Sequence, residues 1–244
     1  MESGVYEAEA RLEATHWWFT GRRKLFARII GKLPIGKEES VLDVGTSTGT
    51  NLRLLREMSF VNVTGIDRSD QAIRFCAEKG LGSVQLGDVT KLPFGEGTFS
   101  LVLATDIIEH IDDDAAALAE IRRVVRPDGF VLLTVPAFMS LWGLQDVVSH
   151  HKRRYRLEEF LERVRSAGLD PSEAFYFNYL LFAPIWSARQ LMKIVKPSVR
   201  SENELNPDWL NAALGAVFAI DTRTAPFLRP PFGVSILVLA RQRS

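Results

Sequence analysis

Residues 41–49 read VLDVGTSTG, a short apolar run that leads directly into a glycine-rich turn. The run is typical of a buried strand, and the residues after Gly49 have the apolar spacing of a helix. Gly45 and Gly49 supply backbone that can turn tightly and approach a ligand closely. A strand, a glycine turn and a helix in this order predict the start of a βαβ unit that binds a ligand at the turn.

The same alternation continues along the chain. After the first strand we expect strands over 61–66, 83–86, 99–105, 130–136, 172–179 and 233–242. Between them we expect helices over 50–58, 70–79, 113–125 and 157–167, and a turn at RPDG, residues 126–129. Helices of this length between strands imply right-handed crossovers and a parallel arrangement. The predicted fold class is therefore α/β: a doubly wound, seven-stranded, mostly parallel, Rossmann-like sheet.

Two predicted segments lie outside this core. N-terminal helices are expected over 6–13 and 16–33, and an apolar helical insertion before the last strand is broken by Pro184, Pro197 and Pro207. The length of 244 residues, 46% of them hydrophobic, suits one domain. We expect a single domain over 1–244, made of a helical cap (1–36), a cofactor-binding core (37–179), the insertion (180–231) and the last strand (232–244).

The charge balance and cysteine content exclude several classes of partner. Lys plus Arg and Asp plus Glu number 30 each, so no net field attracts nucleic acid, and we expect a small-molecule acceptor instead. The single cysteine, Cys76, and an N-terminus without a signal-peptide pattern favour the cytoplasm. No apolar run reaches the roughly 20 residues of a spanning helix. For 180–231 a lid, a peripheral membrane contact and a homodimer contact all stay open.

Acidic residues at the ends of successive predicted strands indicate the ligand of the glycine turn. Asp67 ends the second strand, where a carboxylate can accept hydrogen bonds from both hydroxyls of a ribose. Asp88 follows the third strand and can accept from an adenine amino group, with Val89 packed on the ring. The third glycine that opens the helix of a dinucleotide site is absent. Together with Asp43, these acidic residues suit an adenosyl ligand that carries a sulfonium cation.

Four ordered motifs resemble those of the class I S-adenosylmethionine-dependent methyltransferases, in particular the branch of ubiquinone-biosynthesis-type and related bacterial small-molecule enzymes. They are VLDVGTSTG (41–49), GIDRS (65–69), GDVTKLPFGEGTFSLVLATDIIEHIDD (87–113) and EIRRVVRPDGFVLLTVP (120–136). The resemblance covers 41–136 and implies S-adenosylmethionine as cofactor. It also implies the cofactor contacts: Asp43 and Gly45 at the methionine part, Asp67 at the ribose, Asp88 at the adenine and the Thr105 backbone beside the sulfonium.

Three further cofactor candidates lie within these motifs. Ser47 stands where the family usually has glycine, Gly49 opens the following helix, and Arg68 follows Asp67. The N-terminal HWWFTGRR, residues 16–23, resembles an element of a bacterial subset of the family. That resemblance implies an arginine that pairs with the cofactor carboxylate, which would be Arg23, with Arg22 as the second choice. The aromatic residues of this element either pack the helix on the sheet or help to cover an acceptor pocket.

Methyl transfer is an in-line displacement in which the protein chiefly aligns the nucleophile and removes its proton, so we expect no metal site. Imidazole titrates near neutrality, and three histidines follow predicted strands: His110 after the fourth, His150 and His151 after the fifth. Each either acts as the general base or only shapes its loop. The run Asp112–Asp114 is interpreted as a helix cap. The run Lys152–Arg154 either attracts an anionic acceptor or is a solvated surface.

Three rival functions stay open. The sequence G-T-S-T-G at 45–49 also fits the nucleophile elbow of α/β-hydrolases, but it follows the first strand and no oxyanion loop precedes it. A catalytically inactive S-adenosylmethionine-binding module would keep the same cofactor residues. An NAD-dependent oxidoreductase shares the fold and the ribose carboxylate, yet it would need the missing third glycine.

Overall fold

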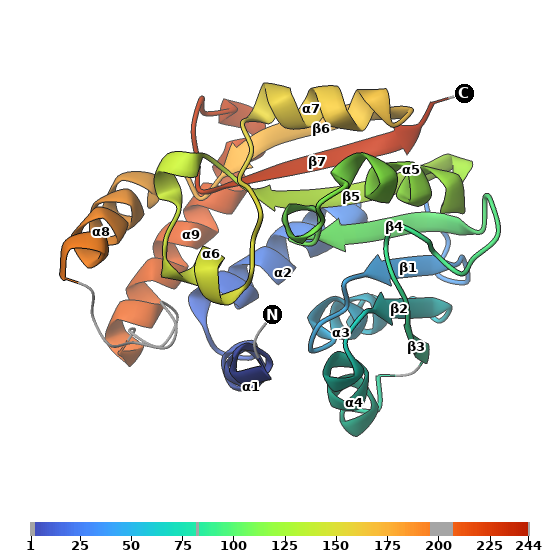
Figure 1. Cartoon of the computed structure of the whole chain (residues 1–244), viewed down its shortest axis with the longest axis horizontal. Helices are drawn as coiled ribbons and strands as arrows, with labels where there is room; N and C mark the ends of the chain where they lie inside the picture. The colour runs from blue at the N-terminus through green and yellow to red at the C-terminus, as the bar shows by residue number, and fades with distance from the viewer. Residues whose placement is uncertain (1–2, 82, 196–206, 244) are drawn as a thin grey trace.

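The computed structural model describes residues 3–81, 83–195 and 207–243. They form a seven-stranded sheet with helices on both faces (Figure 1). The strands are β1 (Val41–Val44), β2 (Val63–Asp67), β3 (Ser83–Leu86), β4 (Phe99–Thr105), β5 (Val125–Pro136), β6 (Leu169–Phe177) and β7 (Ser235–Gln242). Their order is β3-β2-β1-β4-β5-β7-β6, with β7 antiparallel to both of its neighbours. The predicted fold class is confirmed.

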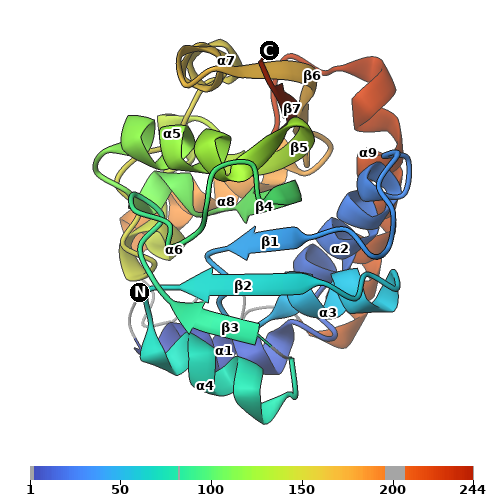
Figure 2. The same ribbon diagram turned by 90° about the vertical axis from the view of Figure 1, so that its right-hand side faces the viewer.

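Helices cover both faces because alternate residues of the central strands point to opposite sides. On one face lie α2 (Trp17–Ile30), α3 (Thr50–Glu57), α4 (Asp70–Glu78) and α9 (Asp208–Leu228); on the other lie α5 (Asp114–Val124) and α7 (Leu157–Ser166). Along β4, Val102 packs toward α5 while Leu101 and Leu103 pack toward α2. Figures 1 and 2 both show the sheet between α7 and α2.

Two local predictions were wrong. The RPDG segment, residues 126–129, lies within the bounds of β5 and not before it, although the pairing of β5 with β4 steps from Val125 directly to Phe130. Pro184 does not break a helix, since it is the third residue of α8 (Phe182–Val195). In the first turn a proline removes no intrahelical hydrogen bond. Pro207 is the N-cap of α9, as a break predicts, and Pro197 lies outside the described residues.

Short elements gather at the carboxyl ends of the parallel strands. They are α1 (Ser3–Leu12), the 3₁₀ turns η1 (Ile108–His110) and η2 (Met139–Leu141), and α6 (Leu144–Val148). Within the described residues, no helix combines the length and the hydropathy that crossing a membrane requires. The loops and short helices at the carboxyl ends of the parallel strands line the cavity described next.

Candidate active site

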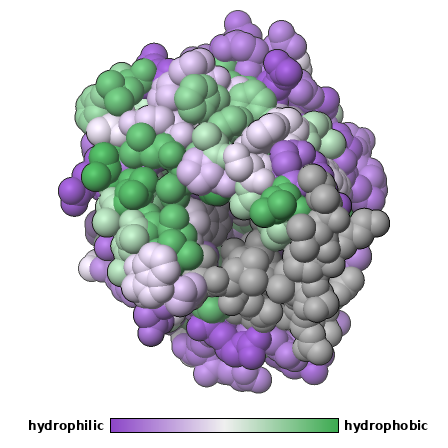
Figure 3. Space-filling view, turned by 90° about the vertical axis from the view of Figure 1, so that its left-hand side faces the viewer, coloured by the Kyte–Doolittle hydropathy of each residue, from purple (hydrophilic) through white to green (hydrophobic). Residues whose placement is uncertain are grey.

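A cavity of about 1120 Å³ opens at the carboxyl edge of the parallel strands. Open α/β sheets bind their ligands at this edge. Its walls come from the loops after β1, β2, β4 and β5 and from α1, α2, α6, α8 and α9. Figure 3 shows a hollow on this side of the molecule, with hydrophobic residues along one margin. Polar strand ends thus lie at one end of the cavity and an apolar wall at the other.

The glycine turn after β1 has the backbone shape expected of the motif. Gly45 has φ +73°, and a Cβ there would press on the side chain of Ile107. Ser47 has φ +50°, in the left-handed region that favours glycine, so it keeps the conformation of the family's usual residue. Its hydroxyl donates to Glu9 Oε2 at 3.0 Å. A serine whose hydroxyl is held by a carboxylate and not by a histidine lacks the partner that a hydrolase nucleophile needs.

Asp67 lies in the cavity wall next to Arg68, where a ribose contact was predicted. Its Oδ2 accepts from the Ser47 backbone N–H and its Oδ1 from that of Ser69, each at 2.9 Å. Burial raises the pKa of Asp67, although these two hydrogen bonds act to lower it. Each oxygen keeps a lone pair for a further donor. The carboxylate is thus both fixed in place and available to a ligand.

Asp43 is fully buried behind the cavity wall. Asn51 Nδ2 donates to Asp43 Oδ1 and to Thr105 Oγ1, both at 2.9 Å, and so ties the ends of β1 and β4 together. Burial raises the pKa of Asp43 to about 7. Thr105 and Asn51 reach the cavity; Asp43 supports them from below.

The structure does not bring the predicted adenine residues to the cavity. Asp88 Oδ1 accepts from the backbone N–H and the hydroxyl of Thr90, at 2.8 and 2.7 Å, and these bonds lower its pKa. Val89 belongs to the core beside α5. Gly49 is the N-cap of α3 with φ +85°, close to Leu81. None of these three predicted cofactor residues lines the cavity.

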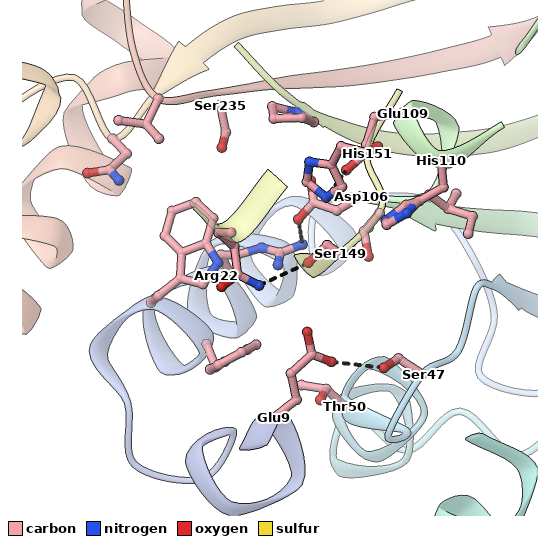
Figure 4. A pocket seen from close by; sticks show the side chains of 18 of the residues that line it. Glu9, Arg22, Ser47, Thr50, Asp106, Glu109, His110, Ser149, His151 and Ser235 are labelled. Carbon is pink, nitrogen blue, oxygen red and sulfur yellow. Dashed lines mark hydrogen bonds and ion pairs between the residues drawn. The ribbon is translucent and has the colours of Figure 1, made fainter. Parts of the chain in front are cut away.

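The side chains of the two adjacent arginines of α2 have different partners. Arg22 forms an ion pair with Asp106 Oδ2 at 2.7 Å, and its Nε is buried without a hydrogen-bond partner. Arg23 lines the cavity too, but its Nη1 donates to the Glu13 backbone carbonyl at 2.5 Å. Figure 4 shows Arg22 between Ser47 on one side and Asp106 on the other.

Helix α1 brings acidic side chains that sequence reasoning missed. Burial raises the pKa of Glu9 to about 7, against the hydrogen bond from Ser47. Glu13 accepts from Lys79 Nζ at 2.8 Å and from Thr48. The spacing of the two glutamates by four residues, which places them on one helix face, was the available signal.

Two of the three candidate bases meet at the cavity wall. The rings of His110 and His151 lie 4.6 Å apart at 89°. Burial, with the neighbouring His151, lowers the pKa of His110 to about 3, so its ring is neutral at neutral pH. His151 Nδ1 pairs with Asp146 Oδ1 at 2.8 Å. His150 also borders the cavity, but its side chain is exposed.

The basic run 152–154 is largely paired within the protein. Arg154 is buried and forms two bonds to the Asp146 carboxylate, at 2.8 and 2.9 Å. Burial alone would raise the pKa of Asp146, but the bond to His151 and this guanidinium hold it below its usual range. Arg153 pairs with Asp114, and Lys152 pairs with Asp112. The predicted cap is confirmed, since Asp113 accepts from the backbone N–H of the third residue of the helix.

The aromatic residues of the N-terminal element meet one aromatic residue of the insertion. Trp17 and Trp18 lie 5.2 and 5.3 Å from the ring of Phe218 on α9. Trp186 and Trp209 do not join them and are 42% and 72% exposed. The apolar wall of the cavity between α2, α8 and α9 contains Leu181, Ile185, Met192, Leu210 and Leu214.

Comparison with known proteins shows what this chain is similar to. A family model described as a methyltransferase domain matches residues 42–133. The 27-O-demethylrifamycin SV methyltransferase of Amycolatopsis mediterranei is 25% identical over 62% of this chain and 61% of its own length. Phosphoethanolamine N-methyltransferase 3 of Arabidopsis thaliana is 30% identical over 62% of this chain and 33% of its own. The chain thus spans less than two thirds of these relatives.

The fold itself recurs in solved structures. The complex between the Haloferax volcanii Trm112 methyltransferase activator and a methyltransferase contains a chain with a TM-score of 0.66 and 19% identity, covering 99% of this chain and 95% of that one. The family model thus matches the part of the chain from β1 to β5, and the likeness to this solved structure extends over the whole fold.

Proposed function

We propose that the protein transfers the methyl group of S-adenosylmethionine to a small-molecule acceptor held in the same cavity. The observation that carries the proposal is the continuity of the cavity, which joins Gly45, Asp67 and Thr105 at one end to an apolar wall at the other. An in-line displacement needs adjoining places for donor and acceptor. The relatives named for rifamycin and phosphoethanolamine methylation support a small molecule as acceptor.

In this proposal the cofactor lies along the glycine turn. Asp67 accepts hydrogen bonds from the ribose, and the Thr105 backbone lies beside the sulfonium. Arg22 takes the cofactor carboxylate in preference to Arg23, because its guanidinium lies at the strand ends beside Asp106, with which it is ion-paired, whereas Arg23 is turned to the backbone carbonyl of Glu13. Guanidinium groups suit carboxylates since their N–H donors are arranged as a fork.

The acceptor then carries an apolar part and a nucleophilic oxygen, nitrogen or carbon atom. Leu181, Ile185 and Leu214 of the apolar wall provide the contact for the apolar part. His110 and His151 are the groups at the cavity wall that act on the nucleophile. The apolar helices over the site exclude water from the reaction, as lids commonly do.

Calorimetry with S-adenosylmethionine, its demethylated product and NAD tests the cofactor assignment. Binding of the first two but not of NAD is expected. Asp67→Ala should weaken cofactor binding by about 1.5–3 kcal/mol, because charge-assisted bonds to the ribose disappear. The exposed Asp70, three residues further along the chain, provides the control Asp70→Ala. Equal losses in both variants would show that the ribose contact is misplaced.

Transfer itself is tested with methyl-labelled S-adenosylmethionine and cell extract, followed by identification of the labelled product. A labelled small molecule that requires the native protein and is lost with Asp67→Ala supports the proposal. Cofactor binding without labelling of any compound would instead indicate an inactive binding module, and tighter binding of NAD an oxidoreductase.

A further inference from the structure

Glu109, His110 and His151 form a compact group at the cavity wall. One ligand atom from each lies within 4.8 Å of the other two. Glu109 and His110 belong to η1, directly after β4, and His151 comes from the loop after α6. Figure 4 shows the three side chains gathered on the far side of Asp106 from Ser47. The fold thus brings together residues that stand 41 and 42 positions apart.

Glu109 lacks the partner that its environment requires. Its side chain is 0% exposed, and neither carboxyl oxygen has a hydrogen-bond partner among the described residues. His151 Nε2 lies 3.9 Å from Glu109 Oε1, which is too long for a hydrogen bond. Buried polar groups are almost always paired, and an unpaired one points to an unseen water or ion. The charges of Arg22 and Arg154 act on Glu109, but Arg22 is paired with Asp106 and Arg154 with Asp146.

Each of the two histidines has one ring nitrogen occupied by a hydrogen bond within the protein. His151 Nδ1 is bound to Asp146 Oδ1, and the ring of His110 hydrogen-bonds the Ser149 backbone. In a neutral imidazole the second nitrogen then keeps a free lone pair. Histidines that bind metals usually give their other N–H to a carboxylate or a backbone carbonyl, which fixes the ring orientation.

From this geometry we infer that Glu109, His110 and His151 bind one divalent transition-metal ion of the Zn²⁺ class. Two imidazoles and one carboxylate suit Zn²⁺, Mn²⁺ or Fe²⁺, whereas Mg²⁺ and Ca²⁺ prefer oxygen ligands. Bonds of about 2.0–2.2 Å place neighbouring ligand atoms roughly 3–3.5 Å apart. The widest separation between two ligand atoms, up to 4.8 Å, therefore shortens by roughly 1.5 Å when the ion binds. The sequence alone predicted no metal site.

Three protein ligands leave a coordination position open toward the cavity. A hydroxyl group bound there would lose its proton at a lower pH than in water. This consequence rests on the proposed function and narrows the acceptor to one that offers an oxygen atom to the metal. The metal ion would then activate the nucleophilic oxygen of the acceptor. Without the ion, His110 or His151 would have to remove the proton from this oxygen.

Metal binding is measured on the full chain after treatment with a chelator. Equilibrium dialysis against Zn²⁺, with metal content by mass spectrometry, should give one ion per chain, and Co²⁺ should give a visible absorption band. Glu109→Gln, His110→Ala and His151→Ala should each lower the Zn²⁺ affinity at least tenfold. His150→Ala, which removes an exposed imidazole next to His151, should leave it unchanged.

Asp146→Asn tests the positioning of His151 while all three ligands remain. It should lower Zn²⁺ affinity by roughly 10–100-fold. Circular dichroism shows whether each variant is folded, and calorimetry in chelator measures S-adenosylmethionine binding separately. The inference is wrong if the folded native protein binds no Zn²⁺ at micromolar concentration, or if the ligand variants bind as the native protein does. Cofactor binding without metal binding would refute this inference alone; metal binding without cofactor binding would refute the proposed function.

Discussion

Replacing Phe218 with alanine should detach the insertion from the N-terminal helix. The Phe218 ring is fully buried between α9 and α2, in edge contact with Trp17 and stacked against Trp18. Gly21 makes this approach possible, since a Cβ at that position would overlap the ring. Phe218 is thus a principal anchor of α9 over the cavity.

The magnitude follows from the burial. Removing a buried phenylalanine side chain costs about 3–5 kcal/mol, from lost transfer free energy plus the cavity left behind. That is a large part of the roughly 5–15 kcal/mol by which domains are stable. Phe227 lies on the same helix and is 81% exposed. Phe227→Ala should therefore change the unfolding free energy by no more than about 0.5 kcal/mol.

Urea unfolding followed by far-ultraviolet circular dichroism gives the free energies of both variants. Phe218→Leu, which keeps most of the apolar volume, should lose less than Phe218→Ala and ensures a folded comparison. Hydrogen exchange should show faster opening of α9 in Phe218→Ala. A loss below about 1 kcal/mol, or equal losses for Phe218→Ala and Phe227→Ala, would contradict the packing of α9 on α2.

Three further outcomes are expected. Gly45→Ala should weaken cofactor binding, because its Cβ presses on the side chain of Ile107, which lines the cavity. Gly80 also has a positive φ but open space around it, so Gly80→Ala should leave the affinity unchanged. Equal effects of the two variants in calorimetry would refute the role of the turn. The unfolded state takes up a proton on His110 near pH 6.5, whereas the folded state does so only near a pKa of about 3. The free energy of unfolding should therefore fall as the pH falls, by about 2 kcal/mol at pH 5 from this residue. His110→Asn should flatten this pH dependence in urea unfolding with a chelator present. Asp221→Ala should lower the free energy of unfolding by about 2–4 kcal/mol, because the buried carboxylate accepts from two backbone N–H groups after β6. The exposed Asp208 provides the control, since Asp208→Ala should change it almost not at all. Similar losses in thermal unfolding of both variants would contradict the role of Asp221.

Local patterns were sufficient for the order of strands and helices and for the glycine turn. Apolar runs such as FSLVLAT, residues 99–105, coincide with β4, and SVQL, residues 83–86, coincides with β3. Periodicity of side chains is a property of neighbouring residues, so a single sequence contains it. The same reasoning failed at 126–129, which lie within the bounds of β5 although the pairing with β4 steps from Val125 to Phe130.

The sequence by itself therefore determined the fold class and the resemblance to methyltransferases, and it predicted the edge of the sheet at which the candidate site lies. Only the tertiary structure decided which polar residues face the cavity: Asp67 and not Asp88, and Arg22 in its centre with Arg23 turned to a backbone carbonyl. It also brought His151 to Glu109. Adjacent helical residues point about 100° apart, and residues far apart in sequence meet only through packing. Neither relation is present in any local pattern.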